Sequence, residues 1–297
     1  MAAGRLAGRH VVLIGAGYVA REFARQAMAK GARVSATARD PGKAAALQAA
    51  GIGLLDMDGD RLAGSVLAGV TDLLVSTPPG AGGCPGLALA GPALAQAGPL
   101  VWIGYLSSTA VYGDCGGEWI DETRPPAPRT ADAKGRLLAE EAWRGAADAH
   151  GAACDILRIA GIYGPGRDML GRLRAGQARA VDKPGQVFNR IHRDDIAGAA
   201  LAAMAAPSGQ RLTNLSDGQP CSSVELTLGV AAMLGLPPPE VVPFDAGTMP
   251  PGMAGFYAEN RRLRNDRLLA LPGYNLRYPD WRAGYGAIVA EARARGF

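Results

Sequence analysis

Residues His10 to Ala20 read HVVLIGAGYVA, a run of apolar residues that passes directly into a glycine-rich turn. The run Val11–Ile14 is typical of a strand buried on both faces, and Ala20 to Lys30 carries apolar residues at helical spacing. Short apolar runs continue to alternate with amphipathic stretches as far as about residue 160. Because strands that alternate with helices are joined by crossovers, this pattern predicts an α/β fold with a doubly wound parallel sheet.

The division of the chain follows from the same pattern. The strands expected in the first half are Val11–Ile14, Arg33–Ala38, Ile52–Leu55, Asp72–Ser76, Leu100–Leu106 and Ala153–Ile159. Residues 1–160 should form a Rossmann-type domain, to which segments at about 186–216 return. Residues 161–185 and 217–297 are less regular and are predicted to form a smaller C-terminal substrate lobe. Within that lobe Phe244–Tyr257, rich in Gly, Pro and Met, is expected to be flexible or to act as a lid.

Composition excludes several classes of protein. The 297 residues are 48% hydrophobic and 20% charged, as in an ordinary globular protein. The net charge is +4, but the arginines are spread along the chain, which argues against a nucleic-acid surface. No apolar run approaches the ~18 residues of a membrane span, so a cytoplasmic protein is expected. The four cysteines form no CxxC pair and no ligand spacing with histidine, so no metal site is predicted.

The glycine turn predicts a dinucleotide site. Gly15, Gly17 and Ala20 form a G-x-G-x-x-A pattern between a strand and a helix. The first glycine permits the tight turn, the second lets the backbone approach a pyrophosphate, and the alanine allows close packing of helix on strand. The pyrophosphate would lie at the helix N-terminus. The residues expected to line this site are Gly15, Gly17, Tyr18, Val19, Thr37, Arg39, Ser76 and Thr77.

The end of the second strand favours NADP over NAD. A carboxylate at that position would accept hydrogen bonds from the ribose 2′-OH of NAD. Here Thr37 or Ala38 occupies the position, and Arg39 follows. A guanidinium can bind a 2′-phosphate through charge-assisted hydrogen bonds. Asp40 is expected to cap the helix that begins at Pro41. The predicted cofactor is therefore NADP, with NAD as the alternative.

Five further motifs carry a family resemblance. They are Tyr105–Asp114 (YLSSTAVYGD), Leu157–Arg167 (LRIAGIYGPGR), Arg190–Ala197 (RIHRDDIA), Asn214–Asp217 (NLSD) and Tyr278–Asp280 (YPD). In this order they resemble the NAD-dependent epimerase/dehydratase type of the short-chain dehydrogenase/reductase superfamily, in its extended and atypical branches. The resemblance spans nearly the whole chain.

The resemblance implies roles for residues at the end of the central strand. Ser108 matches the Ser or Thr that orients the substrate carbonyl, and Ser107 would lie close to the cofactor. Members that act as sugar-nucleotide dehydratases carry an Asp-Glu pair just after this position. Here Thr109 and Ala110 stand there, which argues against dehydration by that route.

The tyrosine that the resemblance leads one to expect is absent. The family's general acid/base is Tyr in Y-x-x-x-K, where the lysine lowers the phenol pKa. Two registers are open in this chain: Thr130 with Lys134, or Asp132 with Arg136. The second is favoured because Glu140 then matches the glutamate that the family places four residues after its lysine. Neither register restores a phenol.

Other donors must therefore be considered. An arginine cannot give up a proton at neutral pH because its pKa is too high. Tyr112 and Tyr163 are the substitute donors that the motifs suggest, and Asp132 would act only if it were buried. Arg190 and His192 are candidates to contact an anionic or polyol substrate.

Two functions fit these observations. The first is an NADP-preferring oxidoreductase or epimerase-like enzyme that acts on a small polar or sugar-like carbonyl or alcohol. The second is a catalytically impaired NADP-binding sensor of the same fold. The resemblance also suggests a homodimer through the helix that contains Leu137–Trp143, although that apolar face could equally be core. The sequence does not name the substrate.

Overall fold

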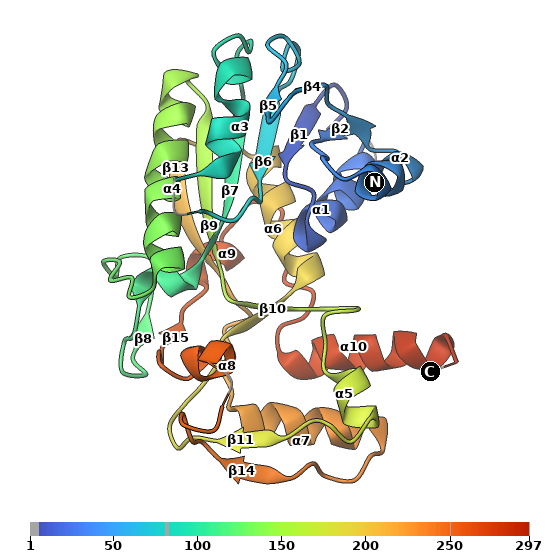
Figure 1. The fold of residues 1–297 in the computed structure, drawn as a ribbon, viewed down its shortest axis with the longest axis vertical. Coiled ribbons are helices and arrows are strands. Elements are labelled where there is room, and N and C mark those ends of the chain that lie inside the picture. The colour runs from blue at the N-terminus through green and yellow to red at the C-terminus, as the bar shows by residue number, and fades with distance from the viewer. Residues whose placement is uncertain (1–5, 81–82, 250, 297) are drawn as a thin grey trace.

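A seven-stranded parallel sheet forms the centre of the molecule (Figure 1). The computed structural model describes residues 6–80, 83–249 and 251–296. The strand order is β13-β9-β7-β6-β1-β2-β3, and every neighbouring pair is parallel. The strands are β1 (His10–Ile14), β2 (Arg33–Ala36), β3 (Gly53–Leu54), β6 (Asp72–Val75), β7 (Trp102–Ser108), β9 (Ala153–Ile159) and β13 (Gln210–Leu215). The predicted Rossmann-type α/β fold is confirmed.

Helices cover both faces of the sheet. They are α1 (Tyr18–Met28), α2 (Pro41–Ala49), α3 (Pro85–Leu94), α4 (Ala131–Ala149) and α6 (Arg193–Ala205). Alternate side chains of a strand point to opposite faces. Accordingly Val11 and Leu13 of β1 join a core with α1 and α6, while Val12 and Ile14 join a second core with α3 and α4. The continuous apolar run of β1 is explained by this burial on both faces.

The helix ends follow local sequence. Asp40 caps α2, its carboxylate accepting a hydrogen bond from the Lys43 N–H at 2.8 Å, and Pro41 begins the helix as predicted. Ser222 caps α7 (Ser223–Leu234) in the same way. Gly235 ends α7 with φ of 70°, a left-handed conformation that glycine adopts without strain.

The C-terminal lobe lies beyond the carboxyl edge of the sheet, at the bottom of the view in Figure 1. Its elements are β10 (Gly161–Tyr163), α5 (Leu170–Arg174), β11 (Ala180–Asp182), α7, β14 (Val241–Pro243), α8 (Pro251–Phe256) and α10 (Trp281–Ala294). The strand β12 (Arg190–His192), in the segment expected to return to the sheet domain, pairs with β10 and leads into α6. A third apolar core, which includes Leu226, Val230, Trp281 and Ile288, holds α7 against α10. The segment predicted as a lid, 244–257, contains α8; its residue 250 lies outside the described residues.

One segment departs from the predicted boundaries. The strand β15 (Arg262–Leu263) pairs with β8 (Trp119–Ile120), and α9 (Asp266–Leu269) contacts β13. Leu268 and Tyr274 belong to the core of the sheet domain. Assigning all of 217–297 to the lobe was therefore wrong for this segment, because its apolar side chains are buried against the sheet domain instead.

Two small features complete the description. The strands β4 (Met57–Asp58) and β5 (Arg61–Leu62) form an antiparallel hairpin after β3. The 3-10 helix η1 (Thr109–Tyr112) follows β7 directly. Within the described part of the chain, no helix combines the length and the apolar character that crossing a membrane requires.

Candidate functional site

Residues that follow three neighbouring strands fix the glycine turn. Gly15 has φ of 89°, and a Cβ at this position would lie 3.0 Å from Thr77 Cγ2 and 3.1 Å from Ser76 Oγ. The Gly15 N–H donates to Thr37 Oγ1 at 3.1 Å, and Ser76 Oγ donates to the Gly15 carbonyl at 2.7 Å. Four predicted cofactor residues are thus brought together at the carboxyl edge of β1, β2 and β6, and only glycine fits at position 15.

The N-terminus of α1 is open to an anion. Gly17 precedes the helix without a side-chain cap, and no acidic residue lies in the first turn. Tyr18 donates from its hydroxyl to the Pro165 carbonyl at 2.9 Å, so its ring turns toward the lobe, and Val19 is buried. Unpaired N–H groups at a helix N-terminus suit a pyrophosphate. The residues present therefore fit a dinucleotide.

Arg39 lies on the surface after β2. Its side chain is 66% exposed, and its ion pair with Asp60 is long, at 3.7 Å, with the Asp60 side chain 91% exposed. Such a pair is weak. Arg39 is therefore available to a phosphate at this end of the site, whereas Thr37 is held by the glycine turn.

The two serines at the end of β7 have different surroundings. Ser107 is buried, and its hydroxyl donates to Glu140 Oε1 at 2.6 Å. Ser108 is half-buried, and its oxygen accepts from the Ala110 N–H at 3.2 Å, which caps η1. A hydroxyl that accepts in this way keeps its own proton to donate. Ser108 is thus the serine with a free donor, and Ser107 is part of the framework behind it.

The framework behind Ser107 is a buried ion pair between α4 and β9. Arg158 donates to both oxygens of Glu140, from Nε at 3.0 Å and Nη2 at 2.7 Å, and both side chains are at most 4% exposed. The Arg158 guanidinium lies over the ring of Tyr112, 4.6 Å from its centroid. Sequence reasoning used Glu140 only to choose a register. Two features of the sequence could have predicted this pair. They are a glutamate on the face of α4 that packs on the sheet, and an arginine within a buried strand.

Tyr112 and Tyr163, the two proposed substitute donors, are both engaged elsewhere. The Tyr112 hydroxyl donates to Asn214 Oδ1 at 2.8 Å. Tyr163 stacks on Tyr285 with ring centroids 5.1 Å apart, and its hydroxyl donates to the Asp280 carbonyl at 3.4 Å. Burial raises the pKa of both phenols above the usual 10.

Of the two registers considered on α4, Asp132 with Arg136 is the one whose cation contacts β7. Thr130 caps the helix, its hydroxyl accepting a backbone N–H at 3.1 Å, while Lys134 and Asp132 are exposed. Arg136 is half-buried, and its Nη1 donates to the Leu106 carbonyl at 3.4 Å. The spacing explains this result, because residues four apart share a helix face and Glu140 faces the sheet.

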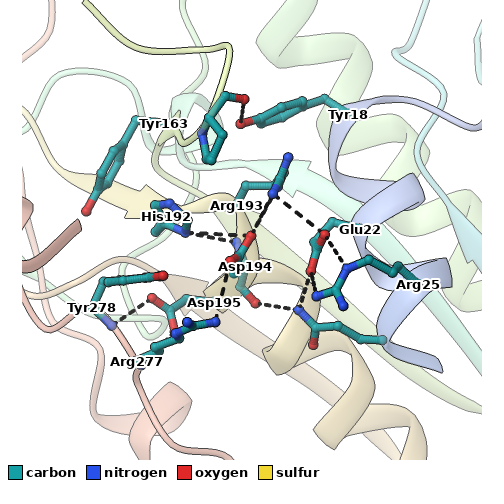
Figure 2. A network of polar contacts seen from close by, with 12 residues as sticks. Tyr18, Glu22, Arg25, Tyr163, His192, Arg193, Asp194, Asp195, Arg277 and Tyr278 are labelled. Carbon is teal, nitrogen blue, oxygen red and sulfur yellow. Dashed lines mark hydrogen bonds and ion pairs between the residues drawn. The ribbon is translucent and has the colours of Figure 1, made fainter. Parts of the chain in front are cut away.

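Arg190 and His192 lie at the junction with the lobe. Arg190 donates to the Phe188 carbonyl at 3.0 Å, and the buried His192 packs edge-on to Tyr163 and against Tyr278 (Figure 2). Their contacts lie around β10 and β12 rather than at the end of β7. The structure does not bring them to Ser108.

Known proteins resemble this chain both in sequence and in structure. Residues 94–214, which include Ser108, Arg136 and Glu140, match the profile of the NAD dependent epimerase/dehydratase family. A protein of Methylobacillus flagellatus, provisionally described as an NAD-dependent epimerase/dehydratase, is 30% identical. The match covers 96% of this chain and 98% of that one, with a TM-score of 0.67. The chain belongs to the NAD-dependent epimerase/dehydratase family.

Three other proteins resemble this chain in sequence or in fold. A conserved protein of unknown function from Silicibacter pomeroyi is 40% identical over 96% of this chain and 99% of its own, with a TM-score of 0.85. Escherichia coli protein YeeZ is 34% identical over 179 residues, 59% of this chain and 58% of YeeZ. MoeE5, solved with UDP-glucuronic acid and NAD, is 17% identical. It covers 97% of this chain and 99% of its own, with a TM-score of 0.73, and shares the fold.

The Glu140–Arg158 pair gives a test of stability. Glu140→Gln leaves the buried Arg158 charge without its counter-charge, so we expect a loss of about 3–5 kcal/mol in the free energy of unfolding. Urea unfolding followed by circular dichroism measures this loss. The matched control is Glu141→Gln, which changes the exposed neighbour on α4 and should have little effect. Equal stabilities of the two variants would contradict the buried pair.

Asp217, at the lobe junction, gives a test of pH dependence. Burial raises the pKa of this carboxyl from 3.8 to about 7. The neutral acid is therefore favoured in the native state, and stability should fall as pH rises from about 4 through about 7. Asp195, whose pKa burial raises to about 6, contributes to the same fall. Asp217→Asn should remove the Asp217 part and stabilise the protein at pH 8, by up to about 4 kcal/mol at ~1.4 kcal/mol per pKa unit.

Urea titrations at pH 5 and pH 8 measure the effect at Asp217. The control is Asp182→Asn at an exposed aspartate, which should leave the pH dependence of the wild type in place. An Asp217→Asn variant that still loses stability between pH 5 and pH 8 like the wild type would contradict the assignment.

Proposed function

We propose that this protein binds NADP and acts as an oxidoreductase or epimerase on a small polar or sugar-like carbonyl or alcohol. The observation that carries the proposal is the pair of groups at the end of β7. Ser108 keeps a hydroxyl proton to donate. Arg136 is held nearby by a hydrogen bond to the carbonyl of Leu106, two residues before Ser108. A hydrogen-bond donor beside a fixed cation suits an oxygen that gains negative charge during reaction.

The cofactor site supports NADP through two features. The rigid turn at Gly15 and the open N-terminus of α1 would bind the pyrophosphate. Arg39 would bind a 2′-phosphate, since among the described residues its interaction is the weak pair with Asp60. A bound nicotinamide dinucleotide would supply or accept the hydride. NAD is the alternative cofactor if Arg39 has no part in binding.

The chain's own residues suggest an incomplete proton relay. Ser108 would donate a hydrogen bond to the substrate oxygen, and Arg136 would stabilise charge on it. Arg136 cannot release a proton near neutral pH, and Asp132 is exposed at the first turn of α4. Water at this edge would therefore supply the proton. Residues of the lobe would set the choice of substrate.

A second candidate function is an NADP-binding sensor. It is favoured by one observation: α4 presents a threonine cap and an exposed aspartate where a phenol would act. Both functions require cofactor binding, which raises the melting temperature; a ~100-fold excess over Kd adds roughly 2.7 kcal/mol. NADPH oxidation with a panel of aldehydes, ketones and keto-sugars separates them, because a sensor would bind NADPH without consuming it.

Replacing Ser108 tests the enzyme. Ser108→Ala should lower kcat/KM for NADPH oxidation about 10²-fold or more, the usual cost of losing one donor to a developing oxyanion. The Kd of NADPH should stay within about twofold. Ser208→Ala, at an exposed serine, is the matched control and should keep full activity. An active Ser108→Ala enzyme would overturn the role of Ser108.

Replacing Arg39 tests the cofactor preference. Arg39→Ala should weaken NADPH binding about tenfold or more, because a charge-assisted hydrogen bond is lost, while NADH binding stays unchanged. Fluorescence titration with both cofactors measures the ratio. Arg144→Ala, at an arginine that pairs with Gln210, is the control. An unchanged ratio of NADPH to NADH affinity would show that Arg39 does not select the cofactor.

A further inference from the structure

A charged cavity lies where the sheet domain meets the lobe, apart from the residues proposed for catalysis (Figure 2). Its volume is about 260 Å³. The sheet domain contributes Glu22 and Arg25 from α1, and the lobe contributes Arg277 just before α10. Its lining contains neither Ser108 nor Arg136. A ligand bound here would therefore touch both domains without occupying the proposed active site.

The three carboxylates that line the cavity, Glu22, Asp194 and Glu291, already accept hydrogen bonds from arginines. Glu22 accepts from Arg25 Nη2 at 2.5 Å and Nε at 3.0 Å, and also from Gln26 at 3.0 Å. Asp194 Oδ1 accepts two hydrogen bonds from Arg193, at 3.1 and 3.0 Å. These oxygens have little capacity left for a cationic ligand.

The guanidinium groups, by contrast, have donors to spare. Each carries five N–H donors and no acceptor. Arg25 and Arg193 each use two of them on a carboxylate, and Arg277 makes a long ion pair of 3.7 Å with Asp194. The Arg25 and Arg277 side chains are 65% and 68% exposed. The three arginines therefore keep N–H donors for an oxyanion, while Glu22, Asp194 and Glu291 balance their charges.

His192 adds an independent observation. Its Nδ1 accepts from the Asp194 N–H at 3.2 Å, so the proton of the neutral ring is assigned to Nε2. Burial lowers the pKa of this imidazole to about 4, which keeps it neutral. Within the described residues Nε2–H has no acceptor, although the side chain is 2% exposed and the residue lines the cavity. A buried donor left unpaired is destabilising, so an anion that accepts from it would be favoured.

Hydrogen bonds to the sheet domain hold the backbone at Arg277 in place before any ligand binds. Asp195 of α6 accepts from the Arg277 N–H at 2.7 Å and from the Tyr278 N–H at 3.1 Å. The backbone that carries the lobe's arginine is therefore tied to the helix that carries Arg193. A site whose parts are held in place before binding loses less entropy on binding.

We propose that this cavity binds a small oxyanion, the phosphate or carboxylate group of a metabolite, and that the bound anion bridges the two domains. Arg25 and Arg193 would bind it from the sheet domain and Arg277 from the lobe. The buried His192 N–H supplies a further donor at the same junction. The inference stands apart from the proposed function, because it involves no residue of the glycine turn or of the β7 end.

Titration of the full-length protein tests the site. Inorganic phosphate and succinate are titrated separately at constant ionic strength, by calorimetry and by thermal unfolding. The titrations are made in the wild type and in an Arg39→Ala parent, so that phosphate bound at the proposed 2′-phosphate position can be recognised; binding that Arg277→Ala and Arg25→Ala leave unchanged would place the anion at another site, such as the N-terminus of α1. We expect saturable binding of at least one anion, with a rise in Tm. Arg277→Ala should weaken the Kd about tenfold or more, as loss of one charge-assisted hydrogen bond implies.

The matched control is an arginine five residues further along the chain, in the first turn of α10. Arg282→Ala removes an arginine that is 56% exposed and pairs with Glu225 outside the cavity, so its Kd should equal that of the parent. Arg25→Ala is the second test variant, from the sheet domain, and should also weaken binding. Circular dichroism without anion shows whether each variant is folded.

The outcomes separate the sources of the anion and the competing explanations. Phosphate binding alone indicates a phosphorylated metabolite, and succinate binding indicates a carboxylate; either supports the site. Absence of saturable binding of both anions overturns the proposal. So does an equal Tm rise in the parent, Arg277→Ala and Arg282→Ala, which would be a general effect of the salt. Binding seen only when Arg39 is intact would place the anion at the cofactor site and also overturn it.

Discussion

The ion pair between Glu140 and Arg158 is the interaction on which the geometry of the site depends. It joins the middle of α4 to β9, and through Ser107 it also fixes the end of β7. Removing two charges from water is costly unless each is fully paired, which here requires the helix and both strands to keep one relative position. Arg136 lies one turn before Glu140, and Ser108 directly after Ser107. The two groups proposed for chemistry are therefore positioned by a pair that is itself almost fully buried.

Much of the sheet domain could be predicted because its signals are local. The strand expected at Ala153–Ile159 is found with those bounds as β9, because a strand buried on both faces is mostly apolar and its two charged residues, Asp155 and Arg158, are paired. The turn at Gly15 was recognisable because its conformation demands glycine. The preference for Arg136 over Lys134 rested on the spacing to Glu140, and a helix preserves that spacing in space. Each of these inferences needed only residues close together in the chain.

The lobe and the interdomain cavity could not be predicted, because long-range contacts determine them. β11 and β14 have three residues each, too few for a periodic pattern, and they pair across some 60 positions. Helix α10 is held by the core that it shares with α7. Arg193 lies near Glu22 only because α6 packs on α1. Tyr163 was proposed as a donor from its motif, but the motif does not show that Tyr285 and Asp280 engage it.

Because α9 and β15 pack on the sheet domain, that domain cannot complete its folding early in synthesis. Leu268 and Tyr274 complete a core whose first strand begins at His10, so that core is not closed until nearly the whole chain has left the ribosome. Domains that are continuous in sequence fold one after another during synthesis. Here the lobe interrupts the sheet domain, and the two must acquire their final packing together. A fragment ending at residue 260 would leave an apolar face of the sheet domain uncovered.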